Sequence, residues 1–217
     1  MSFGSSSAPI ARISRSALAR NVAIAHAKDP SAAIDLRRDA CGHGADIVAA
    51  VAREAGVGTA LRDGEPPVAT LPVEDVFGLE GRGEPAMTLV APVLQTKLLL
   101  EGEGVSYGYR YRPERDTRIA LVSGGYAQGI ARAIGWTDDE PAGTVAVDGE
   151  ECPIIGRVAM DVCVVELGDA EVEPRDEVVF FGAGMPHLLR QWALATGWTE
   201  LELAAIAGLH ARREEVV

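Results

Sequence analysis

The chain of 217 residues is short of several residue types that mark particular classes of protein. It has three cysteines, Cys41, Cys152 and Cys163, without CxxC or His/Cys spacing, so we expect neither a disulfide framework nor a metal site. Only two lysines, Lys28 and Lys97, stand among the 20 basic residues. The remaining cations are scattered arginines and the net charge is −12, which disfavours nucleic acid as a partner.

Long apolar runs are also missing. No stretch reaches the roughly 18 residues that a membrane helix needs, and the first residues lack the basic and apolar regions of a secretory signal. Together with the unpaired cysteines, this predicts a cytoplasmic protein without a membrane partner. Hydrophobic residues make up 47% and charged residues 24%, as in ordinary globular proteins, and the length fits one domain or two small ones.

The N-terminal part has the pattern of a parallel α/β unit. Short apolar stretches at 10–13 and 32–36 predict strands. Helical spacing of apolar residues predicts a serine-capped helix over 14–25 and a second helix over 45–55. Residues 10–56 therefore predict a β-α-β-α segment. The following residues, 58–85, are rich in proline and glycine and predict a connector with at most one short strand or helix.

From residue 86 onward the pattern is that of short strands. We predict strands at 88–97, 118–122, 144–147, 153–158, 162–167 and 176–182. Asp148-Gly149 is a strong two-residue hairpin signal, and late helices are predicted at 188–195 and 199–207. The fold class is therefore α+β: a short βαβα segment within 1–85 and an antiparallel β-barrel-like domain over 86–217.

Four motifs of the second half resemble the alanine racemase family in order and in spacing. They are Val105-Ser106-Tyr107-Gly108-Tyr109-Arg110-Tyr111, Thr117-Arg118-Ile119-Ala120-Leu121-Val122, Gly124-Gly125-Tyr126-Ala127-Gln128-Gly129 and Ile155-Gly156-Arg157-Val158-Ala159-Met160-Asp161. The likeness covers about 86–217. It extends weakly to 10–56, where 12–22 resembles the family's opening strand and helix, and 39–44 resembles the segment that carries its cofactor lysine.

The resemblance implies a N-terminal TIM-type barrel that binds pyridoxal phosphate (PLP), a C-terminal β domain, and interconversion of L- and D-alanine. In such an enzyme a lysine forms an imine with PLP, which then serves as an electron sink. A tyrosine from the partner subunit is the second base, and Tyr107 matches it. Its free pKa of about 10 makes an unaided tyrosine a poor base. The alternative is that Tyr107 packs with Tyr109 and Tyr111 at a strand end.

The same comparison exposes two departures. The lysine position falls on Arg37, and a guanidinium cannot supply the free amine that an imine needs. The aromatic residue that helps to hold the phosphate is Cys41 here, followed by Gly42-His43-Gly44, so Cys41 and His43 are weak cofactor-binding candidates. A TIM-type barrel takes roughly 200 residues at least, whereas residues 10–85 alone precede the β domain. PLP is therefore implied by resemblance, and we expect no covalent attachment.

Three further residues match family positions near the active-site entrance and the substrate pocket: Tyr126, Met160 and Asp161. Their alternative role is that of turn and core residues. We favour a catalytically defective racemase-like protein that forms a homodimer or docks onto a full-length racemase. The second hypothesis is a working PLP-dependent racemase in which other residues, such as Lys28 or Lys97, compensate. The third is a module that binds a small amino acid or carboxylate, with Arg37 as the anion's partner.

Overall fold

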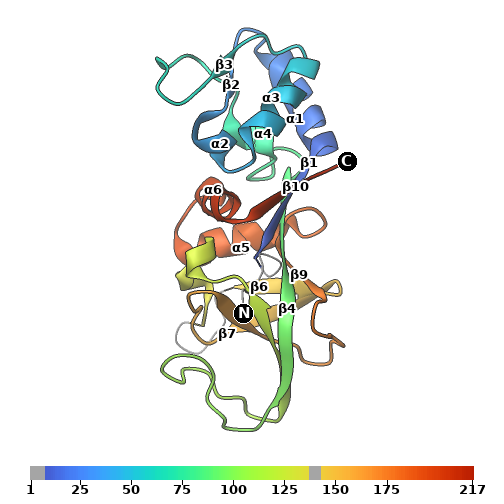
Figure 1. Ribbon diagram of the computed structural model, residues 1–217, viewed down its shortest axis with the longest axis vertical. Helices are drawn as coiled ribbons and strands as arrows, with labels where there is room; N and C mark the ends of the chain where they lie inside the picture. The colour runs from blue at the N-terminus through green and yellow to red at the C-terminus, as the bar shows by residue number, and fades with distance from the viewer. Residues whose placement is uncertain (1–7, 137–142) are drawn as a thin grey trace, which may run out of the picture.

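The computed structural model describes residues 8–136 and 143–217, and it forms two lobes along its long axis (Figure 1). The upper lobe holds the N-terminal helices α1 to α4, and the lower lobe is built from β-strands. Helices α5 (Pro186–Thr196) and α6 (Glu200–His210) lie between the strands and α2. Among the described residues, none of the helices has the length and apolar character needed to cross a membrane.

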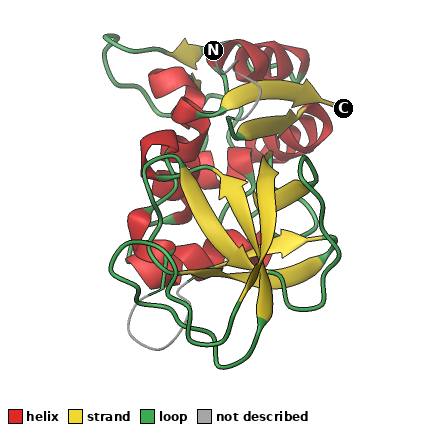
Figure 2. Ribbon diagram, turned by 60° about the horizontal axis from the view of Figure 1, so that its bottom comes forward, coloured by secondary structure: helices red, strands yellow, loops and turns green. Residues whose placement is uncertain are grey.

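Six antiparallel strands close into a barrel in the lower lobe. In ring order they are β4 (Met87–Leu99), β5 (Thr117–Ser123), β8 (Val162–Glu166), β7 (Glu150–Ile155), β6 (Thr144–Val147) and β9 (Glu177–Phe181), and β9 pairs again with β4. Figure 2 shows these strands crossing one another with the helices gathered to one side. The barrel predicted for 86–217 is thereby confirmed.

Local sequence explains much of this barrel. Asp148 and Gly149 have φ values of 50° and 81°, the paired left-handed conformations of a tight hairpin turn, and they join β6 to β7 as predicted. The core side chain Trp192 packs edge-on against Phe180 and Phe181, with ring centroids 5.7 and 5.6 Å away. Its indole Nε1 donates a hydrogen bond to the carbonyl oxygen of a strand residue, so its one polar atom is satisfied.

Strand β1 (Ile10–Ser14) corrects the predicted βαβα segment. It pairs antiparallel with β4 and parallel with β10 (Arg212–Val216), so it belongs to the sheet of the lower lobe instead of opening an α/β unit. Its alternating side chains suit a strand in a sheet of either kind, and in this fold Ala11 and Ile13 are the fully buried ones. The predicted order of strand, helix, strand and helix is present, but the expected place of the first strand in a parallel α/β unit was wrong, because its partners lie far away in the sequence. Strand β10 carries four consecutive charged residues and gave no strand signal.

The upper lobe is a small α/β unit. Its elements are α1 (Arg15–Lys28), β2 (Ile34–Asp35), α2 (Arg37–Cys41), α3 (Ala45–Glu54), β3 (Ala60–Leu61) and α4 (Val73–Phe77). Strand β2 pairs parallel with β3, and a parallel bridge joins Ala33 to Thr70. The connector thus contains both a short strand and a short helix, not at most one of them. No closed α/β barrel is formed by the residues that the structure describes.

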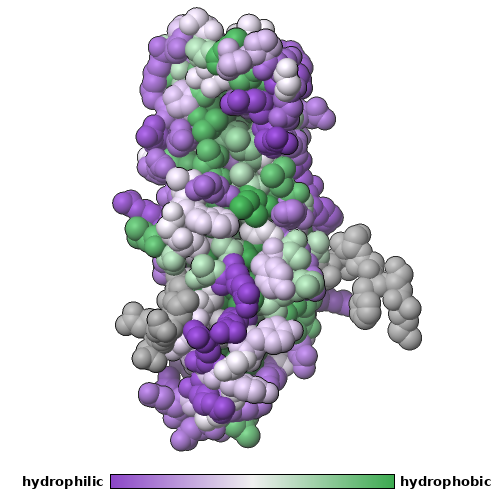
Figure 3. Space-filling view, turned by 90° about the vertical axis from the view of Figure 1, so that its left-hand side faces the viewer, coloured by the Kyte–Doolittle hydropathy of each residue, from purple (hydrophilic) through white to green (hydrophobic). Residues whose placement is uncertain are grey.

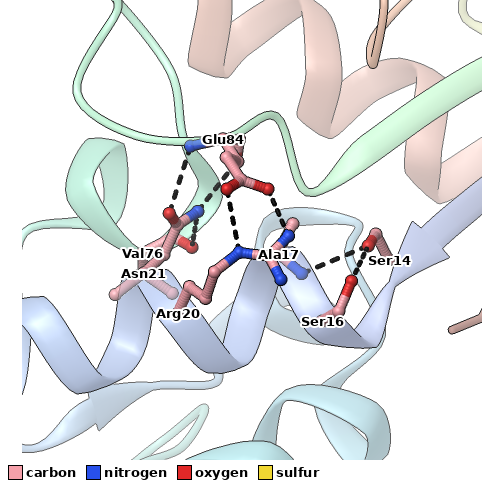
Figure 4. A network of polar contacts seen from close by, with 7 residues as sticks. All are labelled: Ser14, Ser16, Ala17, Arg20, Asn21, Val76 and Glu84. Carbon is pink, nitrogen blue, oxygen red and sulfur yellow. Dashed lines mark hydrogen bonds and ion pairs between the residues drawn. The ribbon is translucent and has the colours of Figure 1, made fainter.

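A polar network ties α1 to the segment that follows α4 (Figure 4). Ser14 Oγ accepts a hydrogen bond from the Ala17 amide at 3.2 Å, which confirms the predicted serine cap. Arg20 Nε lies 2.8 Å from Glu84 Oε1, and the two side chains form an ion pair. Buried Asn21 bonds the backbone of the same segment, so the chain after α4 is held against α1.

Candidate functional site

Tyr107 lies in the loop after β4 and is largely exposed. The loop is fixed to the segment after β7, because Ser106 Oγ donates a hydrogen bond of 2.6 Å to the Arg157 carbonyl oxygen. Gly108 passes close to the same arginine: a Cβ built there would stand 3.8 Å from Arg157 Nη1. Tyr107 is therefore presented to solvent on a loop whose neighbour carries a cation.

Tyr126, Met160 and Asp161 lie together on the segments 125–128 and 159–161. The Tyr126 amide donates to the Ala159 carbonyl at 3.0 Å, and Gln128 Nε2 donates to Asp161 Oδ1 at 3.0 Å. Gly125 and Met160 are so close that a Cβ on Gly125 would stand 2.4 Å from the Met160 carbonyl oxygen. The Gly-Gly-Tyr and Met-Asp motifs thus form one surface, on which all three predicted residues are exposed.

Aromatic and cationic groups continue this surface. The Arg132 guanidinium lies 5.9 Å from the centre of the Tyr126 ring, a cation–π distance. Tyr111 packs edge-on against Trp136 with ring centroids 5.2 Å apart. Burial, followed by a hydrogen bond to Glu166, raises the pKa of Tyr111, so Tyr111 stays a neutral phenol and is no candidate base.

Arg37 lies in the other lobe, at the end of β2. Its Nη2 contacts Asp35 Oδ2 at 2.5 Å and its Nε contacts Asp35 Oδ1 at 3.0 Å. Burial raises the pKa of Asp35, but the hydrogen bonds and charge of Arg37 outweigh it, so the net pKa is lowered. The same bonds raise the pKa of Arg37. The two groups neutralise each other, and the arginine offers neither a free amine nor an unpaired cation.

The segment after Arg37 makes one left-handed turn. Residues 38–41 have φ values between 50° and 57°, and Gly42 follows with 80°. Left-handed conformations cost about 1–2 kcal/mol for each residue with a Cβ, so tertiary contacts must hold this turn. Arg213 supplies several: its Nη2 lies 2.6 Å from Asp39 Oδ2 and 3.2 Å from the carbonyl oxygens of Gly42 and Gly208.

The two predicted cofactor-binding residues are Cys41, in this turn, and His43, just after it. His43 is completely buried, and its ring stacks on Phe77 with centroids 3.8 Å apart. Its Nδ1 lies 3.1 Å from the Cys41 carbonyl, while Nε2 has no partner among the described residues. Burial lowers the pKa of His43 to about 4. Burial, and then the charge of Asp35, raises the pKa of the Cys41 thiol, which makes it a poor nucleophile.

Arg37 and Tyr107, the two predicted catalytic residues, do not meet within one chain. Figure 1 places α2 in the upper lobe and the loop after β4 at the lower end. The two lysines are engaged elsewhere: Lys28 pairs with Asp75 at 3.0 Å, and Lys97 lies 3.4 Å from Glu103. The residues around Arg37 therefore do not fit PLP as an imine. Within the described ranges, no cluster of three acidic, histidine or cysteine side chains could hold a metal ion.

Sequence reasoning missed two members of these surfaces. Arg157 and Gln128 lie inside the quoted motifs, but only the contacts at Ser106 and Asp161 bring out their part in holding the two loops. The spacing Asp-x-Arg at 35–37 was the available signal for the ion pair, since residues two apart at a strand end can turn toward each other.

Comparison with known proteins decides the family. The family model described as alanine racemase, C-terminal domain, matches residues 86–216, more than half of the chain. The chain belongs to the alanine racemase family. Alanine racemase from Thermobifida fusca is 43% identical over 120 residues, which are 55% of this chain and 31% of that protein. The Salinispora arenicola enzyme is 39% identical over 134 residues, 61% of this chain and 34% of its own. The chain described here thus spans about a third of the length of these two alanine racemases.

Solved alanine racemases share its fold. The Streptomyces coelicolor structure superposes with a TM-score of 0.79 at 20% identity, covering 96% of this chain and 98% of that one. The structure of alanine racemase from E.faecalis gives a TM-score of 0.80 at 17% identity, with full coverage of both chains. Because these identities are below 25%, the two structures show that the chain shares their fold and nothing further.

Proposed function

We propose that this protein is a catalytically defective alanine racemase relative that acts as an interaction module and pairs with a second copy of itself. The observation that carries the proposal is the exposure of Tyr107, Tyr109, Tyr126 and Met160, which are 69%, 65%, 46% and 54% exposed. Exposed aromatic and methionine side chains that adjoin arginines are typical of protein interfaces and are uncommon on isolated surfaces.

Arg37 stands where the family has its imine-forming lysine, and it is the reason to propose that racemase chemistry is lost. The Asp35 carboxylate binds this guanidinium through two of its nitrogens. Neither lysine lies at that position, and each is paired with an acid of its own. The same ion pair argues against a carboxylate-binding module at Arg37, because an incoming anion would have to displace Asp35.

A second copy suits the remaining features. Strands β2 and β3 form a two-residue-long sheet, and such short sheets leave backbone groups that a partner can cover. Figure 3 shows hydrophobic side chains along the middle of the face that carries α2 and α6, with hydrophilic ones around them in the upper lobe. A twofold pairing would let the Tyr107 loop of one copy approach the upper lobe of the other, since the two are far apart in one chain.

The oligomeric state tests the proposal. Sedimentation velocity at micromolar concentration should give a dimer for the unaltered chain and a monomer for the double variant Tyr107→Ser, Met160→Ser. The control is Leu194→Ser, because Leu194 is 80% exposed on α5, away from the Tyr107 loop; this variant should stay dimeric. A monomeric unaltered chain that joins a full-length racemase would favour docking instead, and a monomer in both experiments would refute an interaction role.

A second experiment tests the catalytic part separately. After incubation with PLP and borohydride, mass spectrometry of the peptides that contain Lys28 and Lys97 should show no fixed cofactor. The α-hydrogen of alanine should not exchange in deuterated water. Cofactor on either lysine together with exchange would establish the racemase hypothesis in its place.

A further inference from the structure

A cavity of about 240 Å³ lies between the two lobes, and its lining includes Phe77, whose ring stacks on His43. It is formed where α4 and the segment after it meet the end of β9 and the first turns of α5 and α6. Its volume is below the roughly 300–1,000 Å³ that drug-sized ligands occupy. The cavity therefore suits a molecule of the size of one amino acid.

The inner wall is apolar. It is lined by the side chains of Phe77, Met87, Phe181 and Leu189, all of them buried. Two aromatic rings, a thioether and a leucine offer no strong hydrogen-bond donor or acceptor. This part of the cavity accordingly favours an aliphatic or aromatic group over a charged one.

The wall formed by residues 78–85 is held in place by the network of Figure 4. Asn21 Nδ2 donates to the carbonyl oxygens of Val76 and Glu84 at 3.2 and 2.8 Å, and its Oδ1 accepts from the Glu84 amide at 3.1 Å. These three bonds fasten both ends of the segment to α1. The cavity is thus preformed, which lowers the ordering cost of binding.

The rim carries two opposite charges that do not pair with each other. Arg190 on α5 is exposed and makes neither an ion pair nor a hydrogen bond to the described part of the chain. Glu200 begins α6, and its Oε2 accepts the Glu80 amide at 2.6 Å, which fixes the carboxylate and leaves Oε1 available. A cation and an anion at one mouth, above an apolar wall, match a ligand that carries both charges next to an apolar group.

We infer that this cavity binds a free α-amino acid with an apolar side chain. The ligand carboxylate lies on the Arg190 guanidinium, the ammonium lies on Glu200, and the side chain enters between Phe77, Met87 and Phe181. Both ionic groups stay at the exposed rim, so binding does not require them to lose all their water. The inference uses none of the residues of the proposed interface, and the two can fail independently.

Methyl NMR provides the test with L-leucine as the probe. The sequence has four methionines, Met1, Met87, Met160 and Met185. In protein labelled at the methionine methyls, leucine at up to 10 mM should shift the Met87 signal, assigned from Met87→Leu, in a saturable manner. The exposed Met160, on the barrel, is the internal reference and should not move. No movement of Met87 over this range would overturn the inference.

Half-ligands and variants test the two charges. 4-Methylpentanoate lacks the ammonium and 3-methylbutylamine lacks the carboxylate, so each should bind roughly tenfold or more weakly than leucine. Arg190→Gln and Glu200→Gln should weaken leucine binding by a similar factor, and the glutamine keeps an acceptor for the Glu80 amide. Arg53→Gln, an exposed arginine on α3, is the control. Equal binding of leucine and either half-ligand, or unchanged affinity in both rim variants, would refute the assignment.

Discussion

His43 should make the stability of the fold depend on pH. Its ring is fully buried against Phe77, and burial lowers its pKa to about 4, whereas an exposed histidine titrates near 6.5. The neighbouring charges act weakly: Arg213 lowers the pKa further and Asp39 raises it. Between these two pH values the unfolded chain binds a proton that the folded chain does not. The free energy of unfolding is therefore free of this penalty above pH 6.5, and it falls as the pH drops from 6.5 toward 4.

The magnitude follows from the two pKa values. The complete effect would be about 3 kcal/mol below pH 4, since one pKa unit corresponds to about 1.4 kcal/mol. At pH 5.5 the unfolded histidine is about nine-tenths protonated, which gives a loss on the order of 1 kcal/mol relative to pH 8. We choose pH 5.5 because the isoelectric point is about 4.8, and the protein keeps negative charge and solubility above it.

Urea denaturation at pH 8 and pH 5.5 measures the effect. The variant His43→Phe keeps an aromatic ring against Phe77 but cannot titrate, so between pH 8 and pH 5.5 its free energy of unfolding should fall by about 1 kcal/mol less than that of the unaltered protein. His210→Gln, which removes an exposed histidine, should behave like the unaltered protein. An equal pH dependence for the unaltered protein and His43→Phe would refute the reasoning.

Four further outcomes are expected. Gly149→Ala should lower the free energy of unfolding by about 1 kcal/mol, from its φ of 81° alone. Gly42→Ala should cost at least about 1 kcal/mol more, because its Cβ would stand 2.6 Å from the Ala205 carbonyl oxygen; equal urea midpoints would contradict this. Trp192→Ala should cost about 3–5 kcal/mol, read as a lower melting temperature, and a change below about 1 kcal/mol would contradict its core position. Burial raises the pKa of Cys163 to about 12, so mass spectrometry should find it alkylated by iodoacetamide at pH 8 in urea but not in the native protein.

Features set by neighbouring residues could be predicted from the sequence. Ser14 caps α1, Thr199 caps α6 through a hydrogen bond of 3.1 Å from the Glu202 amide, and Asp148-Gly149 turns a hairpin. In each case the residues that determine the structure lie within four positions of one another. The barrel could be predicted as well, because its strands alternate and follow one another at short intervals.

Features set by distant residues could not. Nothing near residues 10–14 says that their partners are β4 and β10, and the left-handed turn at 38–41 depends on Arg213. The same distinction holds for the candidate site, where the residues could be found from the sequence but their surroundings could not. Tyr107 and Met160 were found by resemblance, but their exposure became visible only in the fold. The roles that resemblance assigns to them stay predictions until the experiments above are done.

The position of β1 between β4 and β10 has a consequence for how the protein is made. The ribosome releases β1 about 80 residues before its partner Val90 and about 200 residues before Arg212. During synthesis the nascent chain therefore exposes β1 before its partner strands are made. An unpaired strand of this kind can bind a chaperone or pair with the wrong strand. A fragment beginning at residue 86 would lack β1, so the edge of β4 that pairs with β1 would be exposed. Adding the peptide 8–16 as a separate molecule should restore the solubility of this fragment.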